Sequence, residues 1–168
     1  RRRTPPGFRN ALVQNLAPGH TMVLNPAGMS AARDFMPRPE CITVHDWWLY
    51  QLVTALGGDV VYDDLPGVLY RQHGANQIGN ARGLRLWRQR WRRLWNADLS
   101  GWTARTIAGL DPAGAAMPPE NRRILAAFTT LHTGALPSRL GALRRAGLYR
   151  ETRAGQFGLW LAALLGKF

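Results

Sequence analysis

Cysteine is nearly absent from this chain of 168 residues. The single thiol, Cys41, excludes an intrachain disulfide, and no spacing of cysteine and histidine resembles a zinc site. A long hydrophobic run is missing as well, because the most lipophilic stretch, residues 157–165, is far shorter than the roughly 20 residues that cross a bilayer. The arginine- and proline-rich start lacks the apolar core of a signal peptide. We therefore expect reducing, cytoplasmic surroundings and no membrane span.

Acidic residues are also scarce, and their scarcity is uneven. The chain has 10 acids against 22 lysines and arginines, a formal net charge of +12. Residues 1–78 hold seven arginines and six acids, a net charge of +1, whereas residues 79–168 hold fourteen arginines, one lysine and four acids, a net charge of +11. The partner of the second half should therefore be anionic: phospholipid head groups, nucleic acid or a phosphorylated substrate.

Apolar spacing predicts a central helix that begins at Thr43 and stops at Gly57 and Gly58. Short β-rich runs at 21–24, 60–62 and 68–70 predict strands. Shorter helices are expected at 10–16 and 27–33. Five more are expected later, at 80–99, 102–110, 118–131, 137–146 and 153–165. With 46% apolar residues, the chain can form one ordinary domain, which we expect to be α/β and to carry a helical extension.

The start of the central helix holds the most informative residue, Asp46. Thr43 and Asp46 match a capping box, so a purely structural carboxylate is one interpretation. Trp47 and Trp48 point about 100° apart on a helix, which predicts one ring in the core and the other at a cleft or interface. An aspartate beside an aromatic wall suits general-base catalysis on a sugar hydroxyl, which is the second interpretation.

A polar group follows the predicted strand at 68–70. His73 stands there with Gln72 and Asn76 beside it. A lone histidine near a strand end is most often a hydrogen-bonded surface residue, but this group could also help to hold a divalent cation and its phosphates. The pair Asp63 and Asp64 is interpreted as a turn.

Three motifs together resemble one family. They are Asn15-x3-Gly19-x-Thr21-Met22-x2-Asn25, then His45-Asp46-Trp47-Trp48, then Tyr62-x-Asp64-x-Pro66-x-Val68-x-Tyr70-Arg71-Gln72-His73-x2-Asn76. In this order and spacing they are similar to the second half of the bacterial family 2 glycosyltransferases, in particular the rhamnosyltransferase-like members. The resemblance covers about residues 8–78.

The resemblance implies a GT-A fold and an enzyme. Its reaction would be an inverting, Mg²⁺- or Mn²⁺-dependent transfer of a sugar, for which rhamnose is one candidate, from a nucleotide-sugar donor to a cell-surface polysaccharide or lipid-linked acceptor. By position, Asp46 would be the general base and His73 the metal or diphosphate contact. The substrate-binding residues would be Asn15, Gly19, His45, Trp47, Arg71, Gln72 and Asn76.

The family's Asp-x-Asp metal motif does not occur in this chain. We therefore expect residues 1–78 to be the acceptor side of a catalytic domain whose nucleotide-binding half is missing, so that the isolated chain is inactive. Residues 79–168 would be a basic, amphipathic helical extension.

Three interpretations of this extension stay open. Trp87, Trp91 and Trp95 form a stripe flanked by arginines, and residues 157–165 add a second apolar patch. This composition is typical of helices that lie in a membrane interface, which predicts a cytoplasmic protein peripheral to the inner face of the cell membrane. In the second interpretation, the arginines only form a solvated surface over a small helical core. The alternative function is a non-catalytic, basic membrane- or nucleic-acid-binding protein that retains a glycosyltransferase-like segment.

Overall fold

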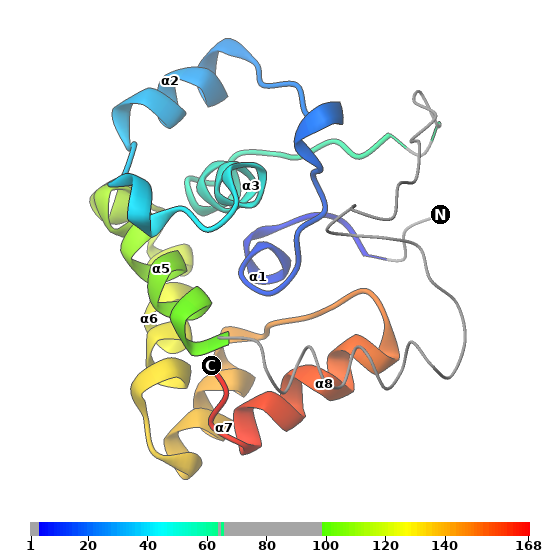
Figure 1. The fold of residues 1–168 in the computed structure, drawn as a ribbon, viewed down its shortest axis with the longest axis vertical. Coiled ribbons are helices and arrows are strands. Elements are labelled where there is room, and N and C mark those ends of the chain that lie inside the picture. The colour runs from blue at the N-terminus through cyan, green and yellow to red at the C-terminus, as the bar shows by residue number, and fades with distance from the viewer. Residues whose placement is uncertain (1–3, 64, 66–98) are drawn as a thin grey trace.

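The structure is a computed structural model, and it describes residues 4–63, 65 and 99–168. Every regular element in this part of the chain is a helix (Figure 1). In chain order these are α1 (Phe8–Ala11), η1 (Gly19–Thr21), α2 (Pro26–Asp34), η2 (Pro39–Cys41), α3 (His45–Ala55), α5 (Leu99–Leu110), η3 (Asp111–Ala116), α6 (Pro119–Thr133), α7 (Leu136–Ala146) and α8 (Arg153–Leu164), where η denotes a 3₁₀ helix.

The expected α/β fold, the carboxyl-terminal part of a GT-A glycosyltransferase, is wrong, because the described residues contain helices and no strand. The run at 21–24 starts inside η1 and continues as irregular chain, and the run at 60–62 is irregular throughout. Val23 and Val61 are 93% and 94% exposed. Such short apolar runs form strands only when a partner supplies backbone hydrogen bonds and a surface to cover. The third run, 68–70, lies outside the described residues.

Most helix predictions are confirmed. The segments expected at 27–33 and from Thr43 are α2 and α3, and those expected at 102–110, 118–131, 137–146 and 153–165 are α5 to α8. Local caps explain two of them, since Asn25 accepts a hydrogen bond from the Gly28 amide and Thr152 accepts one from the Gly155 amide. The helix predicted at 10–16 is wrong in extent, because α1 is four residues long and starts earlier.

One hydrophobic core joins these helices. Its largest side chains include Trp48 and Leu52 of α3, Leu110 of α5, and Phe128 of α6, and residues of α1, α7 and α8 belong to the same cluster. Buried residues from both sides of residue 79 thus form one core. The proposed boundary between 1–78 and 79–168 stays a prediction, since it lies outside the described residues.

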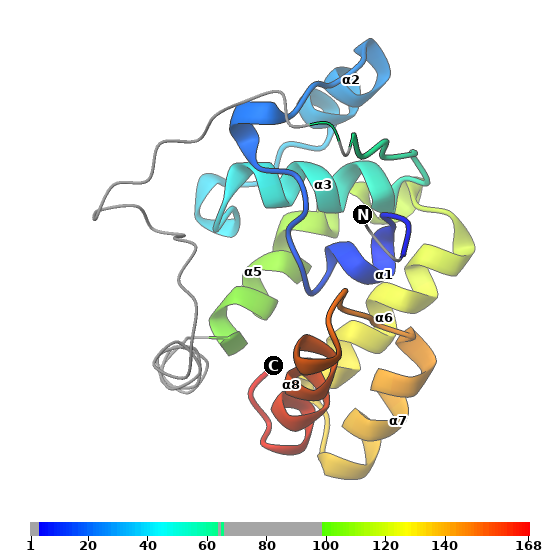
Figure 2. The ribbon, with the colours of Figure 1, turned by 90° about the vertical axis from the view of Figure 1, so that its right-hand side faces the viewer.

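Helix α1 lies between α3 and α8 in both views (Figures 1 and 2). Tyr50 of α3 donates a hydrogen bond to Asn10, and Asn10 donates one to the Tyr149 carbonyl. Arg9 of α1 donates to the Ala146 carbonyl at the end of α7. Through these bonds, the start of the chain connects α3 with the α7–α8 region.

Candidate functional site

Asp46 lies half-buried in the first turn of α3. The N-cap residue of this helix is Val44, whose side chain cannot accept a hydrogen bond, and α3 begins at His45. Asp46 is therefore the second helical residue, whereas a capping box requires the third. The capping-box interpretation is wrong, and the carboxylate is used elsewhere.

Two segments of the preceding loop bind the Asp46 carboxylate. Its Oδ1 accepts a hydrogen bond of 2.9 Å from Asn15 Nδ2, and its Oδ2 accepts one of 2.8 Å from the Gly19 amide. The other end of the Asn15 side chain, Oδ1, accepts a bond of 3.0 Å from the Ala17 amide, which fixes the orientation of the Asn15 amide group. The structure thus brings together three residues that the resemblance places at one site.

This arrangement holds the carboxylate in one orientation and leaves each of its oxygens able to accept a further hydrogen bond. Each carboxylate oxygen can accept two hydrogen bonds, and the loop donates one to each of them. The position at the amino-terminal end of α3 also favours the negative charge, because the helix dipole is positive there. Asp46 can therefore still accept a hydrogen bond or a proton from a bound hydroxyl.

Gly19 approaches α3 too closely for a side chain. A Cβ added at Gly19 would lie 2.9 Å from His45 Nε2 and 3.4 Å from Asp46 Oδ2. Glycine suits this position, because the loop backbone passes close to the start of α3. Both Gly19 and His45 are exposed, so this side of the half-buried Asp46 lies next to solvent.

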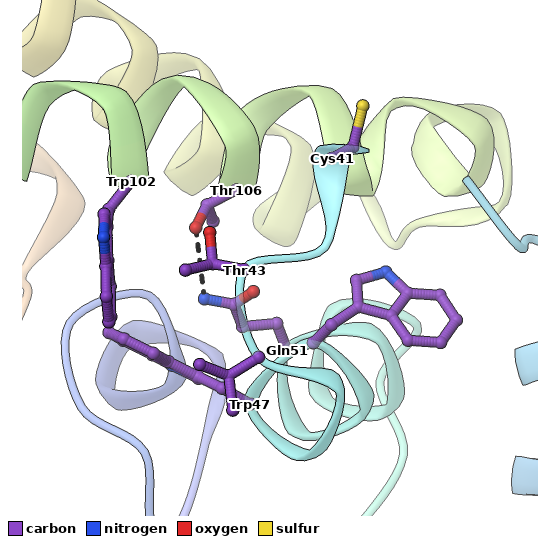
Figure 3. Close-up of a pocket in the computed structure, with 8 residues that line it drawn as sticks. Cys41, Thr43, Trp47, Gln51, Trp102 and Thr106 are labelled. Carbon is purple, nitrogen blue, oxygen red and sulfur yellow. Dashed lines mark hydrogen bonds between the residues drawn. The ribbon is translucent and has the colours of Figure 1, made fainter. Parts of the chain in front are cut away.

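Trp47 does not present a free stacking face beside Asp46. Its Nε1 donates a hydrogen bond of 2.6 Å to the Ala11 carbonyl, and its ring meets that of Trp102 edge-on at 5.5 Å between centroids. Figure 3 shows these two rings at one side of a small pocket between α3 and α5. The pocket volume is about 10 Å³, which is room for about one water molecule and not for a sugar.

The two adjacent tryptophans separate as predicted. Trp48 is buried in the core, where its Nε1 donates a hydrogen bond of 3.0 Å to the Gly109 carbonyl of α5. Trp47 is half-buried at the interface of α3 with α1 and α5. Neither tryptophan therefore forms an open aromatic wall beside Asp46.

Two residues of the α3–α5 interface, Gln51 and Trp102, are not among the site residues predicted from the sequence. Gln51 is 4% exposed, and its Nε2 donates to the Ala11 carbonyl at 3.2 Å. The same Nε2 donates to Thr106 Oγ1 at 3.5 Å, the bond drawn in Figure 3. Its signal was present: Gln51 follows Trp47 by one helical turn, so both face the same neighbours. The contact of Trp102 had no comparable signal, because it joins distant segments.

Four predicted site residues, Arg71, Gln72, His73 and Asn76, lie outside the described residues. Within the described part of the chain, no group of three or more histidine, cysteine, aspartate or glutamate side chains is placed to hold a metal ion. Both Asp46 oxygens already accept N–H donors. These residues therefore do not by themselves fit an Mg²⁺ or Mn²⁺ site, and we derive no reaction step through a metal.

A partly buried cation, Arg150, lies in the segment before α8. Burial lowers the pKa of the Arg150 guanidinium below its ordinary value, and its Nε has no hydrogen-bond partner. Arg150 packs against Gly155 in the first turn of α8. This residue therefore adds positive charge near α8 and none to the Asp46 site.

Comparison with protein-family models, curated proteins and solved structures finds no match to this chain. The resemblance to family 2 glycosyltransferases therefore stays a prediction. Among the described residues, no helix has the length and apolar character needed to cross a membrane.

Proposed function

We propose that this chain provides the acceptor side of a glycosyl-transfer site, with Asp46 as the general base. The observation that supports the proposal is the binding of one carboxylate by Asn15 and by the Gly19 amide, at an edge that remains accessible. The three residues come from the motifs that carry the family resemblance. The proposal depends on this geometry and no longer includes a GT-A fold.

The reaction would be a single displacement. An acceptor hydroxyl donates a hydrogen bond to Asp46, and its oxygen attacks the anomeric carbon of a nucleotide sugar. As the new C–O bond forms, Asp46 takes the hydroxyl proton, and the bond to the nucleoside diphosphate breaks with the electron pair leaving on the diphosphate. Attack from the face opposite the leaving group inverts the anomeric centre.

The residues around Asp46 orient the base and bind the substrates. Asn15 and the Gly19 amide keep the carboxylate in one orientation, which lowers the entropic cost of aligning base and hydroxyl. His45, exposed next to Gly19, can donate a hydrogen bond to a second acceptor hydroxyl. On the donor side, His73 would contact the diphosphate or its Mg²⁺ or Mn²⁺, together with Arg71, Gln72 and Asn76.

A transfer assay on the protein expressed from its complete coding sequence tests this function. Nucleotide sugars and a lipid-linked or polysaccharide acceptor are supplied with Mg²⁺ or Mn²⁺, and the rate of nucleoside diphosphate release is measured. Asp46→Asn should lower turnover by about 10²-fold or more, the usual scale of general-base catalysis.

Asp34→Asn is the matched control, because Asp34 is an exposed aspartate at the end of α2 and loses the same charge. Its turnover should equal that of the wild type. Rates are compared at equal folded fraction, measured by circular dichroism, since Asp46→Asn also loses one hydrogen bond. Near-normal turnover of folded Asp46→Asn would mean that Asp46 only holds the loop.

A further inference from the structure

Helix α8 is apolar on both of its sides. Leu159 and Ala163 face inward and are buried in the core. Phe157 is 62% exposed, and Leu164 and Leu165 are each 48% exposed. With Leu161 they repeat at intervals of four, three and one, which places them on one helix face. We call this face the outer stripe: Phe157, Leu161, Leu164 and Leu165.

The charged face of an ordinary surface helix is missing from α8. Between residues 153 and 165, the one charged residue is Arg153, and no acid occurs. A helix that is apolar all round normally has cover on every side, and exposed apolar residues in one contiguous patch mark a binding surface. We therefore expect the outer stripe to bind an apolar partner.

Cationic side chains lie at both ends of α8 and beside its Trp160 ring. Arg153 begins α8, Arg144 of α7 lies 6.0 Å from the centroid of the Trp160 ring, and the Arg139 guanidinium lies against Gly166 at the other end. Residues 136–168 contain six arginines and lysines and one acid, a net charge of +5. The partner should therefore be anionic as well as apolar.

We propose that α8 is a membrane-surface helix, whose outer stripe enters the head-group region of an anionic lipid bilayer. Lipid offers what both features require: acyl chains cover the stripe, and phosphates face the flanking arginines. The 12 residues of α8 are too few to cross a bilayer, so the helix lies in the plane of the surface. This binding is independent of the reaction proposed for Asp46.

Charge and chemistry disfavour the other candidate partners of the outer stripe: a second copy of α8, residues 79–98 and nucleic acid. A second copy of α8 would bring a net charge of +5 against +5, and residues 79–98, with six arginines and one aspartate, also carry +5. Like charges disfavour both contacts. Nucleic acid matches the charge but binds through phosphate contacts and aromatic stacking, which would leave the leucines uncovered.

Vesicle co-sedimentation tests the proposal on the whole chain. The vesicles contain phosphatidylcholine alone or with a third of phosphatidylglycerol, at low and high salt. Binding should require phosphatidylglycerol and weaken with salt. The variant Phe157→Ser with Leu164→Ser should bind at least about tenfold more weakly, since the apolar area that enters the bilayer shrinks.

Two further variants separate the stripe from general effects. Val23→Ser is the matched apolar control, because Val23 is 93% exposed and lies on the loop before α2, away from α8. Its binding should stay at the wild-type level. Arg144→Gln with Arg153→Gln should weaken binding to anionic vesicles and reduce its salt dependence. Circular dichroism confirms that each variant is folded.

Three results would overturn the proposal. One is unchanged vesicle binding by the serine variant. In that case another segment, such as residues 79–98, would bind the vesicles. Another is concentration-dependent dimerisation that the serine variant abolishes, without vesicle binding. The third is binding of duplex DNA or RNA in place of vesicles.

Discussion

At the scale of single residues, the molecule depends on side chains that join distant segments through short, specific bonds. Asp46 binds positions 31 and 27 residues earlier in the chain, at Asn15 and Gly19. A carboxylate held by one side-chain amide and one backbone amide is fixed without a buried cation, so most of its charge remains available for an incoming hydroxyl. The same bonds should also contribute to the free energy of unfolding.

A double-mutant cycle measures the Asn15–Asp46 contact. Asn15→Ala, Asp46→Ala and the double variant are unfolded in urea, and the coupling free energy should be about 1–2 kcal/mol, as for a hydrogen bond to a charged group. The cycle cancels the bond that Asn15 makes to the Ala17 amide, because both Asn15 variants lose it. Additive single effects would show that the contact does not form in solution.

At the scale of helices, the ends are held by side chains from neighbouring elements. Asn121 of α6 donates from Nδ2 to the Thr54 and Ala55 carbonyls, at 3.0 and 2.9 Å. Both carbonyls belong to the last turn of α3, where helical donors run out. The Thr54 carbonyl also accepts a hydrogen bond from the Gly57 amide, whereas the described donor to the Ala55 carbonyl is Asn121. Thr54 and Ala55 are buried, so water does not readily replace Asn121.

Asn121→Ala should therefore lower the free energy of unfolding by about 1–3 kcal/mol, the cost of leaving the buried Ala55 carbonyl without a donor. Arg123→Ala, an exposed position on the same helix, is the control and should change stability by less than about 0.5 kcal/mol. Both are measured by urea unfolding. Equal effects of the two variants would show that Asn121 does not hold the end of α3.

Local signals in the sequence explain which helices could be predicted. Asn25 and Thr152 cap α2 and α8, and prolines stand in the first turns of α6 and α7. The short β-rich runs failed because strand formation depends on a partner, which a local pattern does not specify. The error in the fold class follows from those runs and from the family resemblance.

At the scale of the whole molecule, the site depends on contacts that no spacing predicts. Asn15 and Asp46 meet because α1 and α3 pack against each other and the loop between α1 and η1 folds back over the start of α3. The motif resemblance named both residues, whereas residue pattern alone left Asp46 with two interpretations, a general base and a capping role that the structure overturns. The place of Trp102 at this interface follows only from the packing of α3 on α5.

The central claim is that a sugar hydroxyl binds Asp46 at the edge formed by Gly19 and His45. The most direct measurement is a titration of the ¹⁵N-labelled chain with methyl glycosides of rhamnose and other sugars, observed at the Gly19 amide. We predict a saturable shift of that resonance at millimolar glycoside, absent in Asp46→Asn and retained in Asp34→Asn. A Gly19 resonance that no glycoside moves, or that moves equally in Asp46→Asn, would contradict the account.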